Sequence, residues 1–225
     1  MTAQLLSLFL AFLSTLSASG ANLAEPTALG QYLVLVNHEY TLSNDYEPDD
    51  LIKPSVRNDS GAILMREEAA HALEDLFASA DADGMHLIAT SGYRSYDTQE
   101  LIYKRKIKNT GSVEKANLLV AIPGTSEHQL GLAMDLKCKT VQNLHPSFAN
   151  SKEGQWIAEH AHEFGFIIRY KKEWTDITGY SYEPWHIRYV GKGHAQIIHE
   201  LDIPLEEYIS TLRLIAEDEY LKGNQ

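Results

Sequence analysis

The stretch SEHQLGLAMDL, residues 126–136, joins a polar loop to an apolar run that is typical of a buried strand. His128 lies in the loop, and Asp135 follows seven residues later on the expected strand. A loop histidine and a strand aspartate can converge on one cation, and zinc accepts both an imidazole nitrogen and a carboxylate oxygen. On this stretch alone, a hydrogen bond or an N-cap is the preferred interpretation of the pair.

A second stretch, EPWHIRYVG at residues 183–191, adds a glutamate and a histidine three residues apart. Pro184 excludes a helix interior and favours extended backbone at Glu183, so a strand-edge segment can direct His186 to a metal. Three protein ligands leave the fourth position of zinc to water, whose pKa falls from about 15.7 towards about 7, and a nearby carboxylate takes the proton. Glu183 is the candidate base. The alternative is a surface ion pair between Glu183 and a neighbour such as Arg188.

A third stretch, SGYRSYDTQ at residues 91–99, is placed at a strand-to-helix corner. Arg94 can form a bidentate pair with a carboxylate or stabilise the oxyanion of a tetrahedral intermediate. Gln99 follows about one helical turn later and can bind an amide of a substrate. By itself, an arginine at such a corner indicates a surface ion pair, so its function depends on the other two stretches.

The remaining sequence mixes helical and strand patterns without a regular βαβ order. This mixture favours an α+β fold, a small antiparallel sheet with helices packed against it, and the span from about residue 31 to 217 reads as one domain. Asp97 is expected to cap the helix that follows the third stretch. We expect strands at residues 32–37, 87–90, 132–137, 166–169 and 183–190, and helices at 65–82, 97–108, 154–164, 195–200 and 205–217, with a short helix after residue 112.

Composition narrows the possible functions. The 225 residues carry 19 Lys+Arg against 31 Asp+Glu, a formal net charge of −12. This acidic balance argues against nucleic-acid binding, which needs a basic surface. Cys138 is the only cysteine of the sequence, which excludes an intramolecular disulfide and a cysteine-rich zinc site. On a strand it would face away from Asp135, so we expect a buried core thiol.

The N-terminal run LLSLFLAFLSTL, residues 5–16, is typical of the hydrophobic region of a secretory signal, with small residues at 18–21 as the cleavage zone. It is shorter than the roughly 20 apolar residues of a membrane-spanning helix. No Lys or Arg precedes it, and the alternative is a buried core helix. We expect a secretory signal peptide over residues 1–21, a single domain over 22–225, and a secreted or cell-envelope protein with no membrane span after signal removal.

Structural or surface roles are expected for the eight histidines outside these stretches. One of them could orient a zinc ligand, because a metal-bound imidazole usually donates its other N–H to a neighbouring group. The eight are His38, His71, His86, His145, His160, His162, His194 and His199.

Taken together, the three stretches resemble the VanY-type D-Ala-D-Ala carboxypeptidases of the LAS metallopeptidases, a group named for lysostaphin, the D-alanyl-D-alanine peptidases and sonic hedgehog. The sequence carries the S-x-H-x6-D motif of this family at residues 126–135, its E-P-W-H motif at 183–186 and its SGYRS segment at 91–95. The resemblance extends in the family's order over nearly all of the chain after the N-terminal apolar run. It implies an LAS/hedgehog-like zinc peptidase fold, in agreement with the α+β expectation.

The resemblance also implies a role for each residue of the motifs. One Zn²⁺ would be bound by His128, Asp135 and His186. Glu183 would be the general base that later protonates the leaving amine, and Arg94 would polarise the scissile carbonyl and stabilise the oxyanion. The pocket for the C-terminal D-amino acid would be lined by Gln99, Ser126, Tyr180 and Trp185.

The implied function is that of a secreted zinc D-alanyl-D-alanine carboxypeptidase. Such an enzyme removes the C-terminal D-Ala from peptidoglycan stem peptides by attack of a zinc-bound water. The same site could serve an L,D-carboxypeptidase, a D,D-dipeptidase or an endopeptidase on peptidoglycan. The alternative from another class is a zinc-stabilised wall-binding module, which would need neither a base such as Glu183 nor an oxyanion donor such as Arg94.

Overall fold

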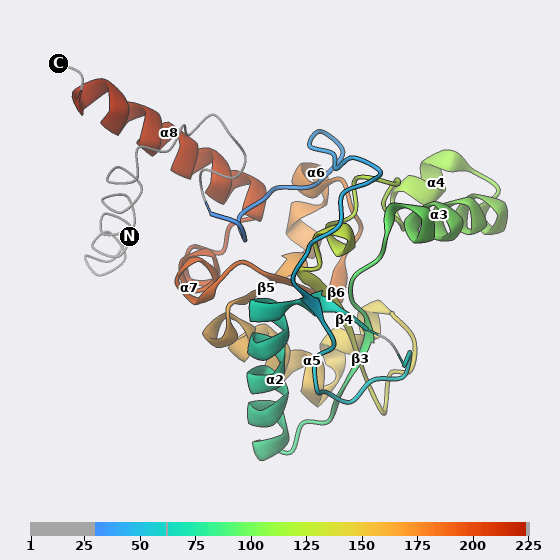
Figure 1. Ribbon diagram of the computed structural model, residues 1–225. Helices are drawn as coiled ribbons and strands as arrows, with labels where there is room; N and C mark the ends of the chain where they lie inside the picture. Colours follow the sequence, from blue (N-terminus) through green and yellow to red (C-terminus); the bar gives the residue numbers. More distant parts are fainter. Residues whose placement is uncertain (1–29, 62, 224–225) are drawn as a thin grey trace.

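A four-stranded antiparallel sheet forms the centre of the computed structural model, which describes residues 30–61 and 63–223 (Figure 1). Across the sheet the strands are β3 (Leu87–Ser91), β4 (Ala133–Cys138), β6 (Glu183–Tyr189) and β5 (Phe166–Tyr170). A separate two-stranded ribbon pairs β1 (Leu51–Ile52) with β2 (Met65–Arg66). This mixture of helices and small antiparallel sheets confirms the α+β prediction. The expected signal peptide, residues 1–21, lies outside the described residues.

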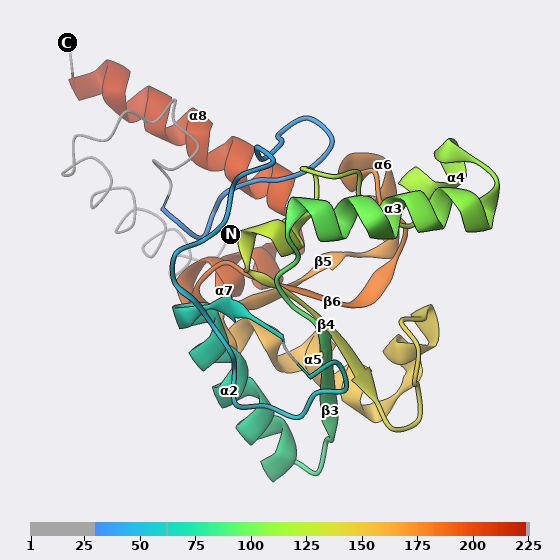
Figure 2. The same ribbon diagram turned by 45° about the vertical axis from the view of Figure 1, so that its right-hand side comes forward.

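Helices surround the sheet and extend from it (Figures 1 and 2). The pair α3–α4 projects to one side of the sheet and α8 to the other, while α2 lies below in both views. The helices are α2 (Glu67–Ala82), α3 (Tyr96–Thr110), α4 (Val113–Asn117), α5 (Lys152–His160), α6 (Thr175–Thr178), α7 (Lys192–Leu201) and α8 (Leu205–Gly223).

Apolar clusters cover one face of the sheet and the β5 part of the other face. On one face, Met134, Leu136 and Ile187 pack with buried side chains of α2 and α5. On the other face, Ile167 of β5 packs with buried side chains of α7 and α8. Cys138 is fully buried in the first cluster, as expected. On β4 and β6, the face away from the α2–α5 cluster is thus left for the site described below.

The alternation of side chains along a strand places two polar groups away from the α2–α5 cluster. Asp135 lies between two residues of that cluster on β4, and His186 does so on β6. The β4–β6 register sets Asp135 directly opposite His186. Residues 51 positions apart in sequence are thus brought side by side by sheet pairing.

The prediction of a strand at residues 32–37 is wrong. The segment is irregular, although its Leu33 side chain is buried. The carbonyl oxygens of Tyr32 and Val34 accept hydrogen bonds from Arg188 Nη2, at 2.9 and 2.8 Å. A guanidinium group therefore pairs with carbonyl oxygens that a neighbouring strand would otherwise bind, while the apolar side chains of the run pack in the core.

Two helix predictions also need correction. The cap of α3 is Ser95, whose Oγ accepts from the backbone N–H of Thr98 at 3.2 Å, whereas Asp97 lies in the first turn. The helix expected over 154–164 is an α-helix only to His160 and continues as a 3-10 turn. That turn is wound more tightly, which carries the chain into the left-handed Gly165 and back to the sheet.

Candidate active site

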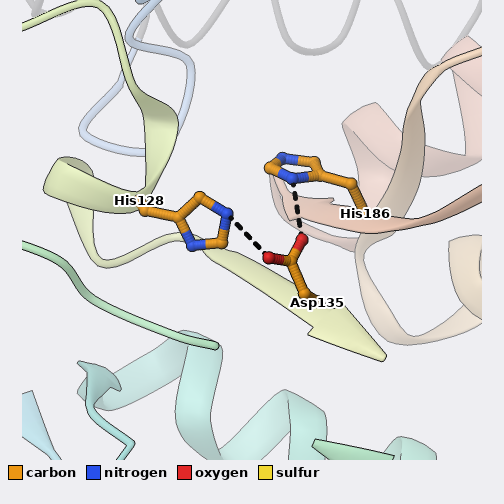
Figure 3. Close-up of side chains that lie close together, drawn as sticks. All are labelled: His128, Asp135 and His186. Atoms are coloured by element: carbon orange, nitrogen blue, oxygen red, sulfur yellow. Dashed lines mark hydrogen bonds and ion pairs between the residues drawn. The ribbon is translucent and has the colours of Figure 1, made fainter. Parts of the chain in front are cut away.

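Three possible metal ligands meet at the two central strands and the turn that precedes them (Figure 3). His128 comes from the 3-10 turn Glu127–Leu130, and Asp135 and His186 come from β4 and β6. All three are buried, and one ligand atom of each lies within 4.8 Å of the others. Asp135 Oδ2 is 3.4 Å from His128 Nε2, and Oδ1 is 3.1 Å from His186 Nδ1. Two nitrogens and a carboxylate thus converge in a geometry that can hold a metal ion.

A backbone carbonyl fixes the ring of His128. Gly92 O accepts a hydrogen bond from His128 Nδ1 at 2.7 Å, which leaves a lone pair on Nε2 facing Asp135. Burial and the nearby Arg94 lower the pKa of His128 to about 4, so the ring is neutral at pH 7. Among the described residues Nε2 has no hydrogen-bond partner. The backbone of Gly92 packs closely against that of Leu64: a Cβ at position 92 would lie 2.4 Å from Leu64 O, so only glycine fits here.

His186 lies between two carboxylates. Its Nδ1 contacts Asp135, and its Nε2 is 3.5 Å from Glu127 Oε2. Burial alone would lower the pKa of His186, but the two carboxylates raise it to about 9. Glu127 was not predicted from the sequence, because its only signal is its place beside His128 in the motif. The orienting partner was expected, if anywhere, among the eight other histidines, whereas His186 contacts Glu127 and His128 contacts the Gly92 carbonyl.

Glu183 begins β6 at the edge of the site. Its Oε2 lies 3.9 Å from His186 Nδ1, and 18% of its side chain is exposed. Burial raises the pKa of Glu183 to about 7, with a contribution from the charge of Asp135, while His186 and Arg94 act in the opposite direction. A carboxyl group with this pKa can both accept and release a proton near neutral pH.

The surface ion pair considered between Glu183 and Arg188 does not form. Arg188 is fully buried, and its Nη1 donates to Glu127 Oε1 at 2.7 Å. Glu183 therefore keeps no arginine from its own strand as a partner, which is consistent with its raised pKa.

Arg94 lies just after β3, next to Asp135. Its Nη1 donates to Gln99 Oε1 at 2.9 Å, and its Nη2 is 3.5 Å from Asp135 Oδ2. Gln99 is buried and donates in turn to Ala121 O at 2.7 Å, which fixes its side-chain oxygen toward Arg94. Arg94 is thus an oriented cation beside the triad, and Gln99 is the group that orients it.

A cleft of about 550 Å³ opens over the triad. Its wall includes Tyr180, whose ring stacks on His38 with centroids 4.8 Å apart and whose hydroxyl is 3.2 Å from Thr125 Oγ1. These contacts hold the ring in one orientation. All nine residues singled out from the sequence line this cleft: Arg94, Gln99, Ser126, His128, Asp135, Tyr180, Glu183, Trp185 and His186.

Comparison with known proteins adds to this geometry. A family model described as VanY, D-alanyl-D-alanine carboxypeptidase, matches residues 62–192, more than half of the chain. YodJ of Bacillus subtilis is 44% identical over 188 residues, covering 81% of this chain and 68% of the relative. The D-alanyl-D-alanine carboxypeptidase of Enterococcus faecalis is 42% identical over 147 residues, covering 62% of this chain and 53% of that protein. The chain therefore aligns with about half the length of the second relative.

Solved structures show the same similarity. The LdcB LD-carboxypeptidase matches with a TM-score of 0.74 and 43% identity, covering 80% of this chain and 86% of that one. A mutant of the vancomycin-resistance D,D-pentapeptidase VanY, in complex with Zn(II), matches with a TM-score of 0.66 and 35% identity, covering 80% and 99%. The sequence motifs, the family match and the shared fold agree, and the chain belongs to the VanY family of D-alanyl-D-alanine carboxypeptidases.

Proposed function

We propose that this protein is a zinc carboxypeptidase that removes the terminal D-alanine from peptidoglycan stem peptides. The observation that carries the proposal is the buried convergence of His128, Asp135 and His186, with Glu183 3.9 Å from the last of them. A metal held by three protein ligands keeps a position open for chemistry, and a carboxyl group beside it can move protons. A binding module would not require that carboxyl group.

The donor set suits zinc. A neutral imidazole nitrogen, a carboxylate oxygen and a second imidazole are ligands that zinc accepts. His128 Nε2 is buried, carries a lone pair and faces a carboxylate, an arrangement that a cation between the two groups would satisfy. The Zn(II) complex of the VanY pentapeptidase supports this choice of metal. When bound, zinc would supply a Lewis acid that polarises a carbonyl and acidifies water.

The residues of the chain divide the remaining work. Glu183 would accept a proton from the attacking water and return it to the leaving amine, a cycle that its pKa of about 7 suits. Arg94, oriented by Gln99, would donate to the carbonyl oxygen as negative charge develops there. The remaining predicted site residues that line the cleft, Ser126, Tyr180 and Trp185, together with Gln99, would bind the C-terminal D-residue.

A second candidate activity is L,D-carboxypeptidase. It is favoured by the LdcB LD-carboxypeptidase, whose TM-score of 0.74 and identity of 43% exceed the 0.66 and 35% of the VanY pentapeptidase. Both activities remove one terminal D-alanine, and they differ in the residue that precedes it. The same metal site and base would serve both.

We further propose that the protein acts outside the cytoplasm, as one domain over residues 22–225. The apolar run at residues 5–16 and a wall-derived substrate support export. In the described part of the chain, no helix combines the length and apolarity that a bilayer span requires.

Mass spectrometry of stem peptides tests this function. The purified protein is incubated with a pentapeptide ending in D-Ala-D-Ala and with a tetrapeptide ending in one D-Ala, with and without chelator, beside the Glu183→Gln variant. Loss of one D-Ala from the pentapeptide, abolished by chelator and restored by zinc, is the expected result. Loss from the tetrapeptide alone would establish the L,D activity instead. If neither peptide is trimmed while zinc is bound, the carboxypeptidase proposal is wrong.

A further inference from the structure

A glutamate outside the predicted site residues lies beside His186. Glu127 is 1% exposed, and its Oε2 is 3.5 Å from His186 Nε2, the ring nitrogen that does not contact Asp135. Glu127 Oε2 is buried and has no closer partner among the described residues. This oxygen is therefore available to the imidazole.

Two arginines hold the other oxygen of Glu127. Oε1 accepts from Arg169 Nε at 2.8 Å and from Arg188 Nη1 at 2.7 Å, and both arginine side chains are buried. Two guanidiniums, one on β5 and one on β6, thus fix the carboxylate through Oε1, and Oε2 faces His186. A carboxylate placed in this way cannot rotate without breaking charge-assisted hydrogen bonds.

The outer end of the network fixes Arg169 in turn. Arg169 donates from Nη1 and Nη2 to the two carboxylate oxygens of Glu206 on α8, at 2.9 and 2.6 Å. Two carboxylates and two guanidiniums therefore balance in charge. Buried charges are tolerated when they are paired and hydrogen-bonded in this way. The network joins α8 and β5 to the back of the metal site.

We propose that Glu127 is a positioning residue for His186: it accepts a hydrogen bond from Nε2–H and so keeps the lone pair of Nδ1 directed at the metal position beside Asp135. The imidazole of a metal ligand commonly donates its second N–H to a carboxylate, which fixes both its tautomer and its orientation. Glu127 occupies the place of that carboxylate. The inference rests on the zinc site proposed above.

Glutamine at position 127 would reverse this preference. The two arginines require an acceptor, so the amide oxygen would turn to them and the NH₂ group would face His186 Nε2. The imidazole would then be favoured with its proton on Nδ1, the atom needed for the metal. Removal of such a partner weakens metal affinity about 10–100-fold.

The test compares two Glu→Gln variants that share Arg169 as a partner. Glu127→Gln changes the carboxylate that faces His186, whereas Glu206→Gln removes a charge from the same arginine at the end away from His186. The zinc dissociation constant is measured by competition with a chromophoric chelator. The Nε2–H signal of His186 is followed by NMR in the zinc-loaded protein labelled with ¹⁵N-histidine.

We expect Glu127→Gln to weaken zinc binding about 10–100-fold and to lose the hydrogen-bonded Nε2–H signal. Glu206→Gln should keep both. Wild-type zinc affinity in Glu127→Gln, or an equal loss in Glu206→Gln, would overturn the positioning role. If Glu127→Gln does not fold, Glu127→Asp decides. It keeps the charge but withdraws the carboxylate, so unchanged zinc affinity there would also overturn the role.

Zinc binding and peptide trimming by the wild-type protein are measured in parallel. A wild type that neither binds zinc nor trims peptide contradicts the proposed function. A wild type that does both, together with an unaffected Glu127→Gln, contradicts the positioning role alone.

Discussion

Glu127 and Glu183 lie on different sides of the His186 ring: Glu127 Oε2 is 3.5 Å from Nε2, and Glu183 Oε2 is 3.9 Å from Nδ1. Both carboxyl groups are removed from bulk water, and burial raises the pKa of each. For Glu127, Arg169 and Arg188 overcome this effect and hold the pKa well below its ordinary value. For Glu183 the effect prevails, and its pKa rises to about 7.

The difference separates two tasks that the same side chain can perform. A carboxylate that stays ionised is suited to orient an imidazole, and one that titrates near neutral pH is suited to carry a proton. The neighbours decide which task is possible, since the distances to His186 differ little. Changes at the two positions should therefore affect different measurements, metal affinity for Glu127 and turnover for Glu183.

The largest effect is expected from loss of the metal site itself, because both glutamates act on it. Asp135→Ala removes the carboxylate that contacts both His128 and His186, so neither glutamate has a metal centre to serve. We expect the variant to bind no stoichiometric zinc and to have no measurable peptide trimming. Metal analysis after gel filtration is the measurement. One zinc per chain in this variant would show that the ligand set is wrong.

Glu183→Gln tests the proton-transfer role of Glu183 separately from metal binding. The amide cannot accept the proton, and we expect turnover to fall about 10²–10⁴-fold while zinc affinity stays at the wild-type value. Glu159→Gln, on the exposed surface of α5, is the matched control. Near wild-type turnover in Glu183→Gln would contradict its assignment as the base.

Arg94→Ala tests the cation that lines the same cleft as Glu183. An oxyanion donor acts mainly in the transition state, so kcat should fall about 10²–10³-fold. Steady-state kinetics with the trimmed peptide separates kcat from KM. A rise in KM with kcat unchanged would instead show that Arg94 binds the substrate carboxylate in the ground state.

The smallest effect concerns stability and has opposite signs for the two glutamates. A carboxyl whose folded pKa is raised makes the fold less stable as pH rises from about 4.5 to about 7, because the unfolded chain loses its proton first. Glu183→Gln should therefore stabilise the metal-free protein at pH 8, by on the order of 3 kcal/mol.

Glu127 has a lowered pKa, so its contribution is present above about pH 4.5 and is lost as pH falls further. Glu127→Gln should destabilise the protein at pH 8. Denaturant unfolding of both variants in chelator is the measurement, and a shift of the same sign in both would contradict the contrast between the two sites.

The sequence was sufficient for the parts of the site that rest on short motifs. His128 and Asp135 lie seven residues apart, and one loop followed by one strand brings them together. The E-P-W-H segment forms a strand because its proline excludes a helix interior and its alternate residues are apolar. Local spacing and a resemblance were enough here.

The role of Glu127 could not be predicted in this way. Its partners Arg169 and Arg188 are 42 and 61 residues away, and only the β5–β6 pairing brings both to one carboxylate. The wrong prediction of a strand at residues 32–37 has a similar cause, because Arg188, more than 150 residues away, donates hydrogen bonds to two carbonyl oxygens of this segment. Long-range ion pairs and hydrogen bonds of this kind leave no local pattern in a sequence.

We propose that one zinc lies between His128, Asp135 and His186, with Glu127 beside the last of them. Anomalous scattering at the zinc edge, from crystals of the zinc-loaded protein, tests it directly. We expect a single peak about 2.0–2.2 Å from His128 Nε2, an Asp135 oxygen and His186 Nδ1, with Nε2 of His186 in hydrogen-bond contact with Glu127. A peak outside this triad, or ligation through His186 Nε2, would contradict it.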